Sequence, residues 1–194
     1  IAGVSDAWGQ IMNPTFANND ENWKGSPDLG GIGGYINAQK KGVKFDVYQE
    51  VTGLPEGIYS LEVQAFYQGS TAGQSYLYAK VGENEVSAAI MSIHADAYAD
   101  SNLEDGKGYF HSGYTPGFPG STADTWSDTG NGYIPTCQEG ASAYFNEGHY
   151  TKNIVWIFVE NDNATLLVGI KNGNNSETND WTCFDNFKLT HYEV

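Results

Sequence analysis

Histidine, cysteine and acidic residues are the side chains most able to do chemistry, and their spacing in this chain matches no catalytic motif. His94 and Asp96 form a His-x-Asp pair that would be half of a metal site, but the sequence has no HExxH and no CxxC motif. The Gly-x-Ser-x-Gly turn of a hydrolase nucleophile is also absent. Paired carboxylates for glycoside hydrolysis need only spatial proximity, which 24 acidic residues leave open. The motifs therefore argue only weakly against an enzyme.

A glycine- and aromatic-rich segment, residues 106–136, has the composition of a binding region. Its 31 residues include seven Gly, three Pro and six aromatic residues. A stretch of this length without periodicity is usually functional or disordered, and its aromatic density argues against disorder. The segment therefore either presents rings to a ligand or packs them onto the domain as a second, smaller core.

Period-two alternation predicts the strands that must position this segment. The pattern is strongest over residues 59–68, where Tyr59, Leu61 and Val63 share one face. Residues 154–159 are apolar on both faces, which predicts a central strand covered on both sides. Further strands are predicted over residues 11–16, 43–51, 76–81, 85–93 and 165–170. One helix is predicted over residues 136–148, with an apolar stripe that docks on a sheet.

The last predicted strand, residues 181–189, carries a carboxylate on its apolar face. Asp185 interrupts an alternating set formed by Trp181, Cys183, Phe187 and Leu189. A buried carboxylate must be paired, hydrogen-bonded or bound to a metal, because leaving it bare costs several kcal/mol or more. The polar loop at residues 18–22 suits a hard cation such as calcium, but it lacks the fixed ligand spacing of an EF-hand, so these residues alone favour a solvated Asn-rich turn.

Three parts of the chain carry recognisable motifs: the aromatic-Asp-Asn-aromatic run at residues 184–187, the motif Asn13-Pro14-x-Phe16 followed by Trp23, and the run from Gln49 to Tyr59 with its Gly-Leu-Pro turn. These motifs resemble those of the galactose-binding-like jelly rolls, to which many carbohydrate-binding modules belong. Residues 136–171 are in addition similar to sandwich modules in secreted proteins of glycan-degrading gut bacteria. The resemblance implies an all-β jelly-roll β-sandwich with one short helix and a long ordered loop insertion.

The resemblance also implies a site for calcium and a ligand. Such modules often hold a structural Ca²⁺ between the first loop and the aspartate of the last strand, which here would use Asn18, Asp20 and Asp185. Ala17 departs from the pattern, because many of these modules have Glu at that place. We expect one domain over residues 1–194, with the insertion around residues 94–136 and the helix around residues 136–148.

Carbohydrate binding without turnover is the function that the resemblance implies. Trp126 has small polar neighbours and no apolar periodicity to bury it, so we predict that its ring stacks on a sugar, with Tyr114 as its companion. The other predicted contacts in this segment are Phe118, Asp124, Asp128 and Asn131. Tyr48 and Phe66, on the polar faces of their strands, are predicted to take this role if the ligand lies on a sheet.

Two other classes of protein stay open. A structural or adhesion domain would present a broad apolar patch to a protein, and a small glycoside-active enzyme would present converging carboxylates. A flat row of exposed aromatic rings would favour the carbohydrate binder. The formal net charge of −15 argues against nucleic acid and anionic lipid as partners.

The chain has no run of 18 apolar residues to insert in a membrane. We expect a secreted, periplasmic or cell-surface protein whose signal peptide is removed. The sequence predicts no oligomeric state. Cys137 and Cys183 form one disulfide or stay as two buried thiols.

Overall fold

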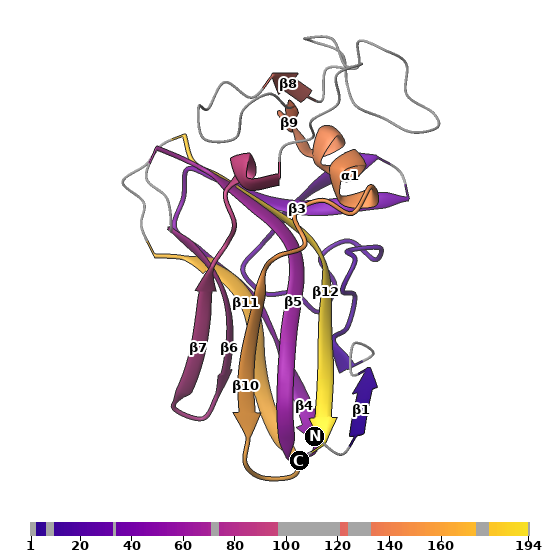
Figure 1. Ribbon diagram of the computed structural model, residues 1–194, viewed down its shortest axis with the longest axis vertical. Helices are drawn as coiled ribbons and strands as arrows, with labels where there is room; N and C mark the ends of the chain where they lie inside the picture. Colours follow the sequence, from indigo (N-terminus) through magenta and orange to yellow (C-terminus); the bar gives the residue numbers. More distant parts are fainter. Residues whose placement is uncertain are drawn as a thin grey trace.

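Two antiparallel β-sheets pack face to face (Figure 1). The larger cluster of buried apolar side chains lies between them. The computed structural model describes residues 3–6, 10–32, 34–70, 74–96, 121–123, 133–173 and 179–193. Within these residues the architecture is the all-β sandwich that the sequence predicted. None of the helices in this part of the chain has the length and apolarity needed to cross a membrane.

Six strands form the first sheet and four form the second. The six-stranded sheet has the order β10 (Ile154–Val159), β5 (Gly57–Gln68), β12 (Trp181–Glu193), β3 (Tyr35–Lys41) and β2 (Asp28–Ile32), with β1 (Gly3–Asp6) also paired to β12. The four-stranded sheet has the order β4 (Phe45–Leu54), β11 (Ala164–Asn172), β6 (Ser75–Val81) and β7 (Asn84–Ala89).

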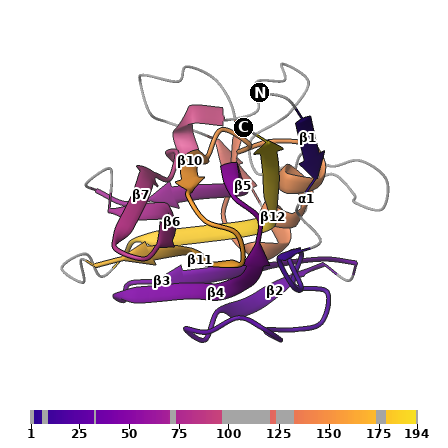
Figure 2. The same cartoon turned by 90° about the horizontal axis from the view of Figure 1, so that it is seen from below.

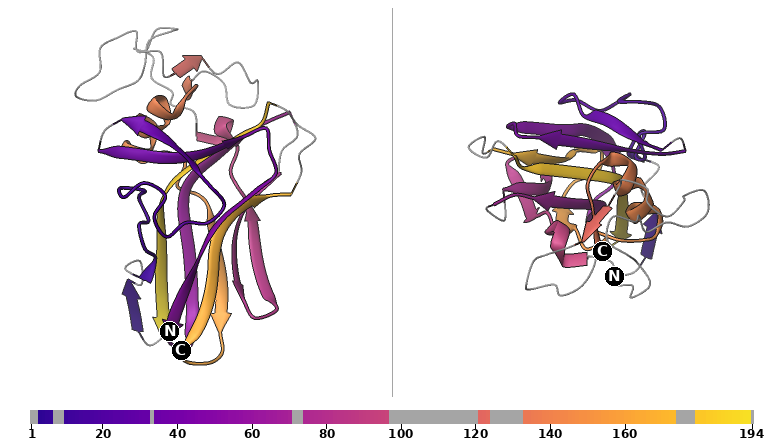
Figure 3. Two further views of the ribbon diagram at one scale, coloured as in Figure 1. Left: turned by 180° about the vertical axis from the view of Figure 1, so that it is seen from behind. Right: turned by 90° about the horizontal axis from the view of Figure 1, so that it is seen from above.

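The remaining elements lie at one end of the sandwich. They are the 3-10 helix η2 (Ile93–Asp96), the strand pair β8 (Ser121–Ala123) and β9 (Tyr133–Pro135), and the helix α1 (Gln138–Asn146). Figures 1 and 3 show them above the sheets, at the end opposite to β1 and the last residues of β12.

Alternating residues of both sheets fill the space between them. Leu61 and Val63 of β5 face Val47 of β4 and Val168 of β11 within one continuous core cluster, and all four are at most 2% exposed. Each such side chain stabilises the fold by about 1.5–3 kcal/mol relative to an exposed one. The period-two pattern in the sequence therefore identified the core faces of these strands correctly.

The helix α1 covers a second apolar cluster on the outer side of the six-stranded sheet. Tyr144 and Phe145 of α1 pack against Phe66 of β5 and Trp181 of β12 in this cluster. Gln64 holds the end of the helix, because its Nε2 donates to the backbone oxygens of Phe145 and His149, each at 2.9 Å. The predicted helix and its docking on a sheet are both confirmed.

The last strand changes the face of its side chains halfway along. The pairing of β12 with β5 shifts register between Asp185 and Lys188, where Asn186 has a φ of 57°. Trp181 and Cys183 consequently face α1, whereas Phe187 and Leu189 face the core between the sheets. The prediction that these four residues share one face is wrong, because a β-bulge adds a residue that the period of two does not include.

Two strand predictions are also corrected. β10 is an edge strand rather than a central one, since β5 is its one partner strand among the described residues, and its Ile154, Trp156 and Phe158 are exposed. Residues 11–16 form no strand; Ile11 and Phe16 join the core from a segment of turns.

Both cysteines are free thiols in this structure. Cys183 is fully buried, and burial raises the pKa of its thiol well above the usual value. Cys137 precedes α1 as its N-cap and is half-buried, which raises its thiol pKa as well.

We predict that the unreduced protein takes up two equivalents of an alkylating reagent after unfolding. In the folded protein Cys137 should react first and Cys183 should react only on opening of the fold, because thiolate formation and access limit the rate. Peptide mass spectrometry of samples labelled before and after unfolding measures both. A mass two hydrogens lower, with no labelling of the unreduced unfolded chain, would show a disulfide instead.

Candidate functional site

The predicted ligand contacts of the insertion cannot be located in the structure. Trp126, Tyr114, Phe118, Asp124, Asp128 and Asn131 all lie outside the described residues, so they stay predictions. Phe66 is described and is fully buried, with its ring centroid 4.8 Å from that of Trp181 and 4.9 Å from that of Tyr150. The prediction of Phe66 as a ligand contact is wrong, because α1 covers the face of β5 on which it lies.

Tyr48 lies on the outer face of the four-stranded sheet. The strand register places Tyr48 opposite Gly169, and Gly169 opposite Tyr78, so that these residues form one row across three strands. The neighbouring row contains Asp46, Lys171 and Tyr76. We call this surface the tyrosine face, and it consists of Asp46, Tyr48, Tyr76, Tyr78, Glu85 and Lys171.

Gly169 allows strands β4 and β11 to lie close together beneath the tyrosine face. A Cβ atom at this position would be 2.4 Å from the backbone oxygen of Val47 and 2.8 Å from the Cβ atom of Tyr48. Contacts that short do not occur, and the first is to backbone, which does not move aside easily. The absence of a side chain at Gly169 therefore determines how closely β4 and β11 approach at Tyr48.

Tyr78 is held rigidly within this surface. Its hydroxyl donates to Asp46 Oδ1 at 2.7 Å, and the Lys171 Nζ atom lies 4.2 Å from its ring centroid. Lys171 in turn bonds Glu85 Oε1 at 2.7 Å. Burial, followed by the hydrogen bond to Asp46, raises the pKa of Tyr78 far above its usual value, so the phenol stays neutral and donates at all physiological pH values.

Tyr76 and Tyr48 present ring surface to solvent beside these charged groups. Tyr76 is 38% exposed, and Tyr48 is partly exposed with the Lys24 Nζ atom 5.8 Å from its ring centroid. The face thus combines aromatic surface with carboxylates that accept hydrogen bonds and a lysine that donates them. This combination suits a neutral polyhydroxylated ligand, whose apolar side covers a ring while its hydroxyls bond the charged groups.

Sequence reasoning identified Tyr48 but missed Tyr76, Tyr78 and Lys171. A signal for the two tyrosines was present, because both alternate with the core residues Leu77 and Ala79 and so must lie on the outer face. The signal for Lys171 was absent. Its position over Tyr78 depends on the pairing of β11 with β6, which no local pattern encodes.

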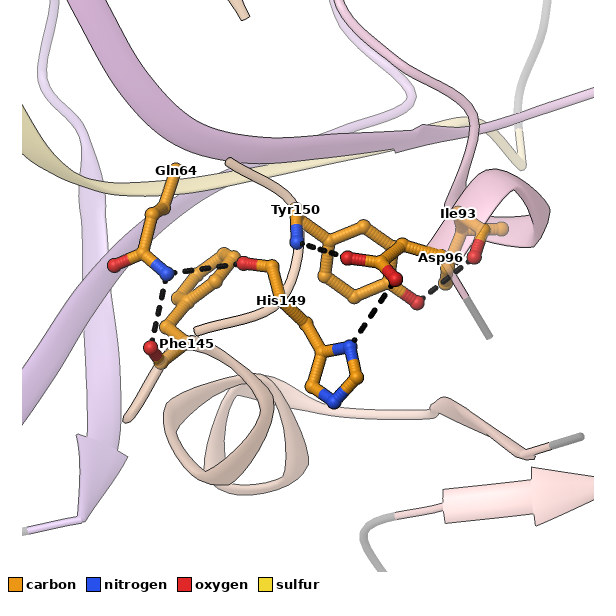
Figure 4. A network of polar contacts seen from close by, with 6 residues as sticks. All are labelled: Gln64, Ile93, Asp96, Phe145, His149 and Tyr150. Carbon is orange, nitrogen blue, oxygen red and sulfur yellow. Dashed lines mark hydrogen bonds and ion pairs between the residues drawn. The ribbon is translucent and has the colours of Figure 1, made fainter. Parts of the chain in front are cut away.

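The pair formed by His149 and Asp96 joins two segments of the fold. His149 Nδ1 lies 3.3 Å from Asp96 Oδ1, while Asp96 Oδ2 accepts from the backbone nitrogen of Tyr150 at 2.8 Å (Figure 4). The Tyr150 hydroxyl donates to the backbone oxygen of Ile93 at 2.8 Å. These contacts tie η2 to the segment after α1. The described residues include no group of three or more His, Cys, Asp or Glu side chains able to hold a metal ion.

Asp185 lines a cleft of about 490 Å³ between β12, α1 and the first loop. Thr15, Ala17, Tyr35 and Asn186 are among the other lining residues, whereas Asn18 and Asp20 are not. Asp185 Oδ1 accepts from the backbone nitrogen of Asn186 at 2.8 Å, so a hydrogen bond already satisfies part of the carboxyl group. Burial raises the pKa of Asp185 from 3.8 to about 8.

The first loop is organised by Asn13. Its Nδ2 donates to the backbone oxygens of Asn19 and Glu21, and its Oδ1 accepts from the backbone nitrogen of Asn18. Asn18 and Asp20 are exposed. Among the described residues, Asp185 is the one carboxylate that lines this cleft, fewer than calcium sites usually use, and calcium binding stays a prediction.

Solved structures with a similar fold include two modules studied with carbohydrates. TmCBM61, in complex with beta-1,4-galactotriose, aligns with 94% of this chain and 98% of its own at 16% identity and a TM-score of 0.47. TmCBM27, a carbohydrate-binding module studied for specific mannan recognition, aligns with 98% of this chain and 96% of its own at 13% identity and a TM-score of 0.37.

An enzyme also contains a region of similar fold. This chain aligns over 90% of its length with 28% of Xylanase10C from Cellvibrio japonicus, at 8% identity and a TM-score of 0.34. No protein-family model matches the sequence, and no curated protein matches it. These likenesses concern the fold, and they assign no ligand to this chain.

We predict that the stability of the protein falls as the pH rises from about 4 to about 8, because Asp185 stays protonated in the folded state while the unfolded chain ionises. Asp185→Asn cannot ionise, so its free energy of unfolding should fall less over this range. Urea unfolding of both proteins at several pH values measures the difference. Parallel pH profiles would contradict the raised pKa.

The same pair of proteins tests the calcium prediction. A cation on Asp185 would favour the charged carboxylate, so excess Ca²⁺ should raise the melting temperature of the wild type at about pH 8 and leave Asp185→Asn unchanged. Identical wild-type midpoints in calcium and in chelator would show that no stabilising calcium site exists.

We further predict that Gly169→Ala destabilises the protein by about 1–3 kcal/mol, because the added methyl group forces β4 and β11 apart. Gly173→Ala is the matched control, since nothing lies within 4 Å of a Cβ atom there. Denaturant unfolding measures the free energies. Equal values for the two variants would show that the strands adjust without cost.

Proposed function

We propose that this protein binds carbohydrate without chemical turnover, on the tyrosine face of the four-stranded sheet. The observation that carries the proposal is the exposed ring of Tyr76 in the same row as Asp46 and Lys171, next to the row of Tyr48. The aromatic surface supplies binding free energy on desolvation, and the charged groups select the orientation of sugar hydroxyls.

Each residue of the tyrosine face has a separate part in the proposed mechanism. Tyr76 and Tyr48 stack on sugar rings. Asp46 and Glu85 accept hydrogen bonds from hydroxyls, while Lys171 donates. Tyr78 is 3% exposed, so it positions Asp46 and Lys171 rather than contacting the ligand. A face built from neutral rings and charges of both signs needs no net charge on its ligand.

The proposal includes the expectations that the protein is exported and that the insertion contributes to binding through Trp126. A protein-binding adhesion domain is the second candidate function. It is favoured by the apolar residues exposed on β10, which lie on the other sheet. The tyrosine face and β10 can be tested separately for that reason.

A glycan array run with and without calcium would first identify a ligand. Calorimetry with the soluble oligosaccharide should then show that Tyr76→Ala and Lys171→Ala each weaken binding at least about tenfold, as expected for the loss of a stacking or charged contact. Tyr35→Ala is the matched control, because Tyr35 is 52% exposed but lies on β3 of the six-stranded sheet. Mass spectrometry of the recovered oligosaccharide should show no cleavage.

Trp126→Ala distinguishes the two predicted sites. If it abolishes binding while Tyr76→Ala binds like the wild type, the ligand site lies in the insertion and the tyrosine face is not used. Cleavage of the oligosaccharide would contradict binding without turnover.

A further inference from the structure

Strand β10 exposes a row of large apolar side chains at an edge of the six-stranded sheet. Ile154, Trp156 and Phe158 are 38%, 49% and 47% exposed, and they alternate with three buried residues that face the core. At Phe158 the apolar surface continues onto neighbouring strands, since Ile58 lies opposite Phe158 and Tyr192 opposite Ile58, whereas Ser60 and Glu62 lie opposite Trp156 and Ile154. Contiguous apolar surface of this kind marks an interaction site in a soluble protein.

This surface differs in chemistry from the tyrosine face. Residues 154–159 include no charged or polar side chain, and the ring of Trp156 packs 5.2 Å from that of Tyr192. The strand thus lacks the interleaved hydrogen-bonding groups that orient a sugar. An apolar strand without such hydrogen-bonding groups is suited to contact another apolar protein surface.

Among the described residues β10 has one unpaired backbone edge, and β6 and β7 of the other sheet lie near this strand. On one side it pairs with β5 from Val159–Gly57 to Ile154–Glu62, and Figure 2 shows the two strands side by side. Within the described residues no strand pairs with its other side. Six apolar residues without proline, glycine or charge form an edge that readily accepts a partner strand.

The sequence around β10 is complementary to itself in the antiparallel direction. Counting outward from Trp156, Ile154 corresponds to Phe158, Val155 to Ile157, and Lys152 to Glu160. Lys152 and Glu160 flank β10 and are both exposed, and they continue the alternation of exposed and buried residues to which Trp156 belongs. We propose that β10 pairs with β10 of a second copy of this chain across a two-fold axis at Trp156, forming a homodimer with one continuous sheet.

Charge complementarity selects this register. Residues directly opposite each other in an antiparallel pair share a face, so the adjacent allowed registers are centred on Val155 or Ile157. The first of these would place Lys152 opposite Phe158, and the second would place Glu160 opposite Ile154. Only the register centred on Trp156 places each lysine opposite a glutamate and every apolar residue of the exposed row opposite another.

The net charge determines the conditions under which the dimer is measured. Each chain carries a formal charge of −15, so two copies repel each other at long range. This repulsion is screened beyond about 8 Å at physiological ionic strength, whereas the contacts within the strand pair are shorter. Association is therefore expected in about 0.15 M salt and is expected to weaken at low salt.

Sedimentation velocity over a range of protein concentrations tests the proposal. The wild type should show a reversible monomer–dimer equilibrium. Lys152→Glu and Glu160→Lys each replace two attractive pairs by two repulsive ones, which should raise the dissociation constant about tenfold. The double variant Lys152→Glu with Glu160→Lys should restore the wild-type value. Lys44→Glu and Glu21→Lys, at exposed positions of other segments, are controls with the same changes in charge.

Several outcomes would overturn the proposal. A wild type that stays monomeric at about 1 mM excludes the dimer. Failure of the double variant to restore the affinity lost in the single variants excludes the register. A dimer that persists in Trp156→Lys excludes β10 as the interface. If Trp156→Ala loses oligosaccharide binding while all proteins remain monomeric, the exposed apolar residues of β10 bind sugar instead of a second copy of the chain.

Discussion

The β-bulge in β12 is the constraint on which the rest of the structure depends. β12 pairs with β5, β3 and β1, so its register determines the arrangement of the six-stranded sheet. Before the bulge Trp181 and Cys183 face α1, and after it Phe187 and Leu189, on the same parity of the strand, face the core between the sheets. Asn186, at the bulge, donates from Nδ2 to Gln64 Oε1, and Gln64 holds the end of α1. One irregular position thus couples the core, the helix and the cleft of Asp185.

The outer faces of the two sheets carry side chains of different kinds. The six-stranded sheet uses its upper outer surface to hold α1 and leaves an apolar row exposed along β10. The four-stranded sheet carries tyrosines and charges on its outer surface, fixed by the hydrogen bond of Tyr78 to Asp46 and by Lys171 over the Tyr78 ring. Since the core between the sheets is shared, a substitution on either outer surface is expected to affect the other only through stability.

Alternation in the sequence predicted most strands of the two large sheets, because the side-chain period of a half-buried strand is two residues. The apolar stripe at helical spacing predicted α1, and the resemblance to galactose-binding-like jelly rolls implied the sandwich. Alternation did not predict the exposure of side chains that depends on how strands pair and on what packs over them. The exposed row of β10 follows from its place at the edge, and Phe66 is buried because α1 packs over it, neither of which a local pattern records. Tyr48 was identified as outward-facing by parity alone, whereas the position of Lys171 over Tyr78 required the register of β11 with β6.

The two proposals reinforce each other through geometry. A dimer formed along β10 would join the six-stranded sheets and leave the outer faces of both four-stranded sheets uncovered. Two tyrosine faces on one particle would bind a polymeric ligand with avidity, because the second contact becomes intramolecular. Weak single sites then give tight binding to a polysaccharide and poor binding to a short oligosaccharide. Such a difference would arise from assembly rather than from additional contacts within either face, so it depends on Lys152 and Glu160 as much as on Tyr76.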